Sequence, residues 1–180
     1  MPKLNQRTLK QRLKSLSHEE LLDEIGVLFD KFTKVKEYYE IKLGAGDNQQ
    51  VLEKYKAIIK NEFNPPRGLP KARLSVAKKA ISDFKKLSNS PVDLADLMLS
   101  YVEAGVGFTL EFGDIDEPFY NSMESMYEKA VKHIFAHRLQ NQFEWRCRKI
   151  VTDTSGMGWG FPDALGDIYD EHFRTSYGAA

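Results

Sequence analysis

The chain has 180 residues, of which 42% are hydrophobic and 29% charged, a balance that excludes an intrinsically disordered protein. The single cysteine, Cys147, excludes an internal disulfide. No uncharged apolar run approaches the length of a membrane span, and the N-terminus lacks the apolar core of a secretory signal. We therefore expect a cytoplasmic protein.

Helical periodicity dominates the sequence. A basic helix is expected at 4–16, and the capping box formed by Ser17 and Glu20 opens a helix that runs to about Leu43. Further helices are expected at about 49–62, 71–87, 118–138 and 140–152 and from Pro162 onward. Another is expected to start at Ser90 and Pro91, an N-cap followed by a proline in the first turn. Gly105 and Gly107 are expected to fray or kink the end of the helix that contains them.

These elements predict an all-α fold of seven or eight helices, either a compact bundle or a short α-solenoid-like array. No repeat of 33–47 residues indicates a known solenoid family. We expect one domain, 1–180, in which an N-terminal hairpin at 4–43 can pack on 49–175.

The net charge of zero conceals an uneven distribution. Residues 1–90 hold 19 Lys and Arg against 11 Asp and Glu, whereas residues 91–180 hold 7 against 15. The halves therefore carry opposite charge. We favour the interpretation that the two halves pack together and neutralise each other. The alternative is that the two halves bind different partners.

The helix expected at 71–87 has a lysine-rich face, which includes Lys71 and Lys78. A solvated surface is the simpler interpretation of this face, and a phosphate-binding surface is the functional one. Arg73 instead projects from the apolar face, in a first turn where the helix dipole disfavours a cation. We expect a carboxylate partner for it, Asp114 or Asp116, and the alternative is a bound anion beside Lys71.

Four carboxylates lie between Glu111 and Glu117, including Asp114 and Asp116. They could gather on Ca²⁺ or Mg²⁺, but an acid before a helix also serves as its cap, and we favour the cap. His133 and His137 have a spacing that zinc sites use. No third ligand shares their helix face, so we expect no metal there and a buried His137.

The glycine-rich segment 154–162 is expected to be a tight loop with Trp159 packed as a plug. In the alternative, Trp159 and Phe161 line a groove, because glycines let a partner backbone approach closely. Cys147 lies between Arg146 and Arg148, which could lower the pKa of an exposed thiol. Its apolar neighbours favour a thiol in the core instead.

Three stretches carry a family resemblance: KARLSVAKKAISDF at 71–84, GDIDEPFYNSME at 113–124 and DTSGMGWGF at 153–161. They resemble an uncharacterised family of small bacterial proteins that carries a domain of unknown function. The resemblance implies a bacterial origin, and it brings no activity, ligand or catalytic residue.

The sequence singles out no activity. We favour a non-enzymatic helical scaffold that binds a protein or peptide partner. Aromatic side chains expected at the surface and the absence of an evident nucleophile–base pair support this function. The candidate binding residues are Lys71, Arg73, Lys78, Asp114, Asp116, Glu117, Trp159 and Phe161.

One alternative function is nucleic-acid binding through the basic segments 3–14 and 67–86, but the zero net charge argues against it. The other is a small metal-dependent enzyme built on the acids at 114–117. No cofactor is expected, and the oligomeric state stays open.

Overall fold

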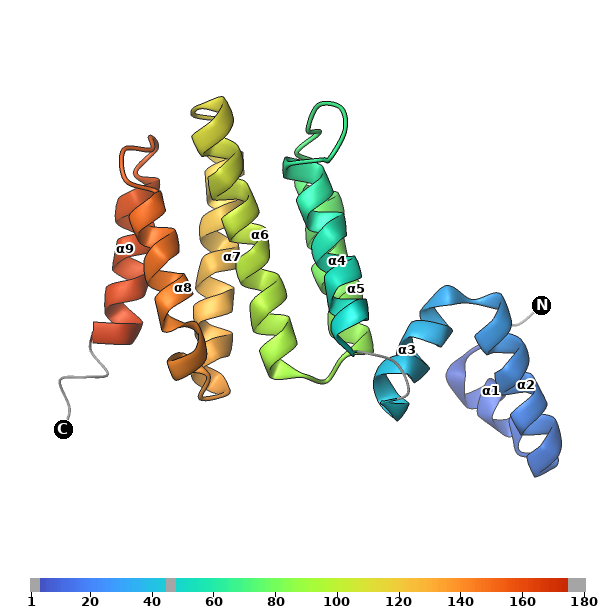
Figure 1. Cartoon of the computed structure of the whole chain (residues 1–180). Helices are drawn as coiled ribbons and strands as arrows, with labels where there is room; N and C mark the ends of the chain where they lie inside the picture. The colour runs from blue at the N-terminus through green and yellow to red at the C-terminus, as the bar shows by residue number, and fades with distance from the viewer. Residues whose placement is uncertain (1–3, 45–47, 175–180) are drawn as a thin grey trace. The chain divides into compact units, whose positions relative to one another are not determined.

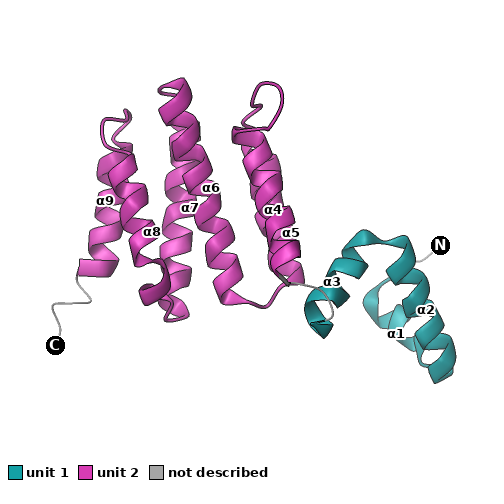
Figure 2. Ribbon diagram, in the orientation of Figure 1, with its two compact units in different colours: residues 1–47 teal, residues 48–180 magenta. Residues whose placement is uncertain are grey.

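The computed structural model describes residues 4–44 and 48–174. Within these ranges the chain is all-α, as expected, with nine α-helices, one π-helical turn and no strand. The contacts divide the chain into two compact units, residues 1–47 and 48–180 (Figure 2). The boundary lies just beyond the predicted hairpin at 4–43. None of the helices in the described ranges has the length and hydropathy needed to cross a bilayer.

Unit 1 contains α1 (Gln6–Leu13), α2 (His18–Lys31) and α3 (Thr33–Leu43) (Figure 1). The capping box is confirmed: the Glu20 amide donates to the Ser17 hydroxyl, and the Ser17 amide donates to the Glu20 carboxylate at 2.7 Å.

The prediction of a single helix after Ser17 is wrong. The backbone of Phe32 is extended (φ −123°, ψ 107°) and separates α2 from α3. This break lets the Phe29 and Tyr39 rings approach to 6.4 Å, whereas on one continuous helix the two residues would lie about 15 Å apart. Apolar periodicity continues through both helices, and so it does not reveal the break.

Unit 2 is a helical bundle that consists of three helical hairpins. The hairpins pair α4 (Asn48–Phe63) with α5 (Leu74–Leu87), α6 (Pro91–Phe112) with α7 (Glu117–Ala136), and α8 (Gln140–Asp153) with α9 (Phe161–Tyr169). Helix α6 packs against both α4 and α8, and α7 packs against α9. The first helices of the hairpins therefore form one layer and the second helices the other (Figure 1).

Gly105 and Gly107 do not end α6, which continues through both to Phe112. A Cβ atom at Gly105 would lie 2.3 Å from the Sδ atom of Met123 on α7, so this glycine lets the two helices pack closely. A Cβ atom at Gly107 would meet nothing within 4 Å. The prediction of a frayed end at these glycines was wrong. Helix α6 packs against several other helices, and this packing keeps it helical through both glycines.

Candidate functional site

Two neighbouring grooves lie on the layer formed by α4, α6 and α8. The groove between α4 and α6 has a volume of about 480 Å³ and is lined on its apolar part by Ala57, Ala104 and Phe108. The groove between α6 and α8 has a volume of about 260 Å³ and includes Leu110 and Trp145. Glu103 and Gly107 line both grooves, and so they join the two into one continuous surface.

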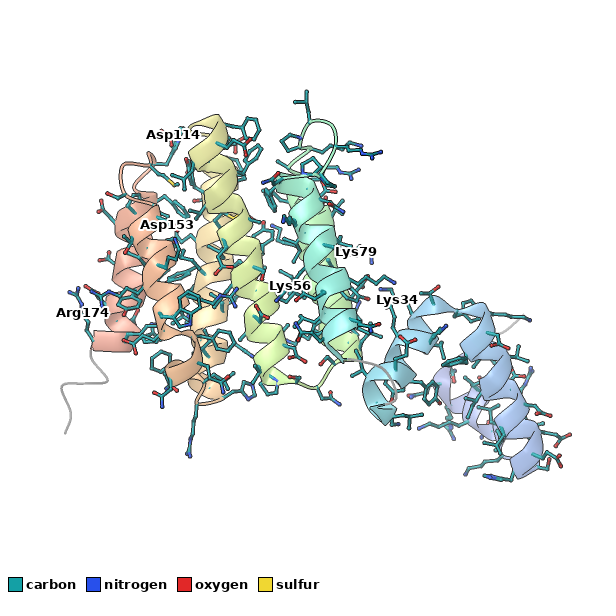
Figure 3. All side chains as sticks on the ribbon, in the orientation of Figure 1. Lys34, Lys56, Lys79, Asp114, Asp153 and Arg174 are labelled. Carbon is teal, nitrogen blue, oxygen red and sulfur yellow. The ribbon has the colours of Figure 1, made fainter. Side chains whose placement is uncertain are left out.

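An ion-pair network fixes the three helices that carry this surface. Arg146 of α8 donates to Asp96 at 2.6 Å and to both carboxylate oxygens of Glu103 at 2.8 Å, and both acids belong to α6. Lys56 of α4, which points towards α6 in Figure 3, binds the other oxygen of Asp96 at 2.7 Å. The four side chains therefore connect all three helices. Lys56–Asp96 also joins the basic half of the chain to the acidic half.

Burial on its own would lower the pKa of Arg146. Its hydrogen bonds to Glu103 and Asp96 outweigh this effect and raise that pKa. Burial likewise would raise the pKa of Asp96, but the bonds from Lys56 and Arg146 lower it. Both charges are therefore stabilised in place, and the network holds the spacing of the grooves.

Lys60 and Trp145 are two side chains on this surface that are accessible to a ligand. Lys60 lines the α4–α6 groove and is exposed, and it makes no ion pair with any described residue. Trp145 is 64% exposed beside the α6–α8 groove. The surface therefore offers an exposed lysine, an aromatic ring and two partly apolar hollows.

The predicted acids serve the loops at one end of the hairpins. Asp114 accepts hydrogen bonds from the Tyr120 hydroxyl at 2.5 Å and the Gly158 amide at 3.0 Å, joining the loop before α7 to the loop before α9 (Figure 3). The Tyr120 bond lowers the pKa of Asp114. Asp116 caps α7 by accepting from the Phe119 amide at 2.9 Å, so the predicted cap is confirmed. Glu117 is exposed in the first turn.

Trp159 and Phe161 lie in different environments. Trp159 is 61% exposed and takes the left-handed conformation (φ +61°), so the prediction of a packed plug is wrong. Phe161 is 2% exposed, with its ring 4.9 Å from that of Tyr120. The glycine-rich sequence did not reveal that the aromatic residue packed in the core is Phe161, two residues after Trp159.

Arg73 binds Glu62, so the predicted partners Asp114 and Asp116 are wrong. Its Nε and Nη2 atoms donate to the two Glu62 oxygens at 2.9 and 2.6 Å, and its own amide donates to Oε2 at 3.1 Å. Arg73 is the N-cap of α5 and does not lie in its first turn. The preceding loop returns it to the end of α4, where Glu62 lies. Lys71 and Lys78 are exposed.

His133 and His137 lie side by side at the end of α7. The His133 Nε2 atom lies 2.9 Å from the Pro91 carbonyl oxygen, and the two imidazole rings are 4.4 Å apart. His137 is exposed, so the prediction that it is buried was wrong, because α7 ends at Ala136. No group of three His, Cys, Asp or Glu side chains in the described ranges could hold a metal ion.

Cys147 is a core thiol, as favoured. The side chain is buried, and burial raises the pKa of the thiol to about 12. A thiol of this pKa is protonated at neutral pH, whereas a reactive cysteine acts as the thiolate.

The groove residues were not among the candidates predicted from the sequence. Lys60, Phe108 and Trp145 occur in ordinary amphipathic helices, where nothing distinguishes them from other surface residues. Gly107 carried a usable signal, because a glycine inside a helix is costly.

In comparisons with known proteins, the family of unknown function DUF6155 matches residues 4–173. No curated protein and no solved structure matches the chain.

Proposed function

This chain belongs to DUF6155, a family of unknown function, and we propose that it is a non-enzymatic scaffold that binds a peptide segment of a partner protein. The peptide lies along the layer of α4, α6 and α8, with side chains in the two grooves. A bacterial cytoplasm is part of the proposal, supported by the family resemblance and by a buried, unpaired Cys147.

Gly107 is the observation that carries this proposal. A glycine inside a helix costs about 1 kcal/mol relative to alanine. Neither close packing nor a left-handed backbone requires a glycine at this position, since a Cβ atom would meet nothing within 4 Å. Gly107 lines both grooves. A side chain at this shared position would occupy free space beside both grooves, so its absence supports a ligand that extends across both.

The lining residues indicate the chemistry of the peptide. The hollow beside Phe108 and Ala104 suits an apolar side chain, and exposed Trp145 suits a second apolar anchor. The unpaired Lys60 suits an acidic residue next to the first anchor. A nucleic acid is less well suited, because Glu53 and Glu103 line the same groove as the lysines.

The test begins with selection of peptides from a displayed random-sequence library on the immobilised full-length protein. Dissociation constants of the selected peptides are then measured by calorimetry for the wild type and two variants. Gly107→Trp places a bulky side chain where the two grooves meet and should weaken binding at least tenfold, which corresponds to about 1.4 kcal/mol. Gly166→Trp on α9 is the matched control, because a Cβ atom there also meets nothing within 4 Å and α9 belongs to the other layer.

Lys60→Glu gives a second readout from the same selection. It should weaken the binding of acidic peptides and leave peptides without an acidic residue unaffected. Failure to select any peptide, or equal binding by the wild type and Gly107→Trp, would contradict the proposed function.

A further inference from the structure

Several apolar side chains in the described part of unit 1 are exposed. None of the apolar residues of α1, α2 or α3 is buried. Leu22, Ile25 and Leu28 repeat at helical spacing along α2, and Phe32 at its C-cap continues the stripe. These four side chains are 55%, 40%, 38% and 53% exposed. Glu19 and Glu24 lie one helical turn before Leu22 and Leu28, so acidic side chains border this stripe. An exposed apolar stripe of this kind is typical of an interaction surface.

The charges of the first two helices are complementary. Residues 4–14 contain four basic side chains and no acid, namely Arg7, Lys10, Arg12 and Lys14. Helix α2 contains five acids and one lysine, and the acids are Glu19, Glu20, Asp23, Glu24 and Asp30. Within the described ranges no ion pair joins these bases to these acids. Apart from Glu20, whose carboxylate accepts from the Ser17 amide, these charged side chains therefore remain available to groups outside unit 1.

We propose that unit 1 binds a second copy of this chain, with α1 of each copy against α2 of the other. In an arrangement with two-fold symmetry, one basic–acidic contact is made twice and the apolar stripes of both copies are covered. A nucleic acid or an anionic bilayer would attract α1 but would be repelled by the five acids of α2. A second copy is the partner that matches both charges. This association does not involve the grooves of unit 2.

The test is the mass of the full-length protein in solution, measured by sedimentation equilibrium after nuclease treatment. The chain mass is 20.7 kDa, so the wild type should sediment with twice this mass. Two charge-reversal variants are compared with it. The first carries Arg7→Glu, Lys10→Glu and Lys14→Glu, and the second carries Asp23→Lys, Glu24→Lys and Asp30→Lys. All six positions are exposed, and the Ser17–Glu20 capping box is left intact.

Each variant alone should be monomeric, because its α1 and α2 carry the same sign of charge. An equimolar mixture of the two should restore a dimer, since every contact then joins opposite charges again. This restoration also shows that both variants are folded. Ile25→Glu, in the apolar stripe, should give a monomer with an otherwise unchanged unit 2.

Three outcomes would overturn the proposal. The wild type could remain monomeric across the micromolar range. The charge-reversal variants could dimerise as strongly as the wild type. The mixture could stay monomeric although both variants retain the helix content of the wild type by circular dichroism.

Discussion

The pairing of Glu62 with Arg73 has consequences for stability at low pH. Glu62 is 5% exposed, and hydrogen bonds from the Arg73 side chain lower its pKa, although burial opposes this effect. A carboxylate whose pKa is lower in the folded chain stabilises the fold at pH values above its ordinary pKa of 4.5. That contribution should be lost as the pH falls through the lower, folded value.

Arg73→Met should destabilise unit 2, because it removes the two side-chain donors of the Glu62 carboxylate. The loss should be small, because the Arg73 side chain is 53% exposed and water screens the ion pair. Urea denaturation at neutral pH measures it. Combining Arg73→Met with Glu62→Gln should cost less than the sum of the single changes. Combined with Asp114→Asn, which removes no partner of Arg73, the effects should add. Additivity with Glu62→Gln would show that the pair contributes nothing.

The two glycines of α6 should respond to alanine with opposite signs. Gly107→Ala should stabilise the protein by up to about 1 kcal/mol, since it improves helix propensity and meets no neighbour. Gly105→Ala should destabilise it, because overpacking costs about 1–3 kcal/mol and the fully buried Met123 would have to move. Thermal unfolding of both variants is the measurement. Equal stabilisation by both would mean that α6 and α7 do not pack as closely as described.

At the scale of elements, Asp114 holds two loops together. Asp114→Ala removes the acceptor for the Gly158 amide and should speed hydrogen exchange at that amide. Tyr120→Phe keeps the Asp114 acceptor and should change the exchange less. The buried Tyr127 amide of α7 is the internal control, because neither change touches its helical hydrogen bond. Unchanged protection of Gly158 in Asp114→Ala would exclude this role. Since the Tyr120 bond lowers the pKa of Asp114, acidification through that lowered pKa should also weaken the contact.

The sequence predicted elements better than it predicted the contacts between them. Capping patterns located the starts of α2, α6 and α7, because an N-cap bonds within a few residues of itself. The partner of Arg73 depends on where the loop between α4 and α5 returns, and no local pattern encodes that path. The grooves arise from the stacking of α4, α6 and α8, helices separated in the chain by their hairpin partners. Gly107 was noticed in the sequence, but only its surroundings explain it.

At the scale of the whole molecule, the two units differ in what stabilises them. Every buried apolar side chain in the described ranges belongs to unit 2, from Val51 to Phe173. Unit 1 is a segment of fewer than 50 residues, and a single hydrophobic core in so short a segment rarely supplies more than about 3–5 kcal/mol. Helices without buried packing are marginal in water. The helices of unit 1 should therefore be the less stable part of the chain.

This difference predicts two separate unfolding steps in urea. Both tryptophans, Trp145 and Trp159, lie in unit 2, so tryptophan fluorescence reports unit 2 alone, whereas far-ultraviolet circular dichroism reports the helices of both units. We expect circular dichroism to show an early loss of helix that fluorescence does not detect. If unit 1 folds against a second copy, this early step should move to higher urea as protein concentration rises, by mass action. The fluorescence step should not move.

In the Arg7→Glu, Lys10→Glu, Lys14→Glu variant the early step should lose its concentration dependence, and the later step should be unchanged. A single transition that both probes report at every concentration would show that the two units unfold together.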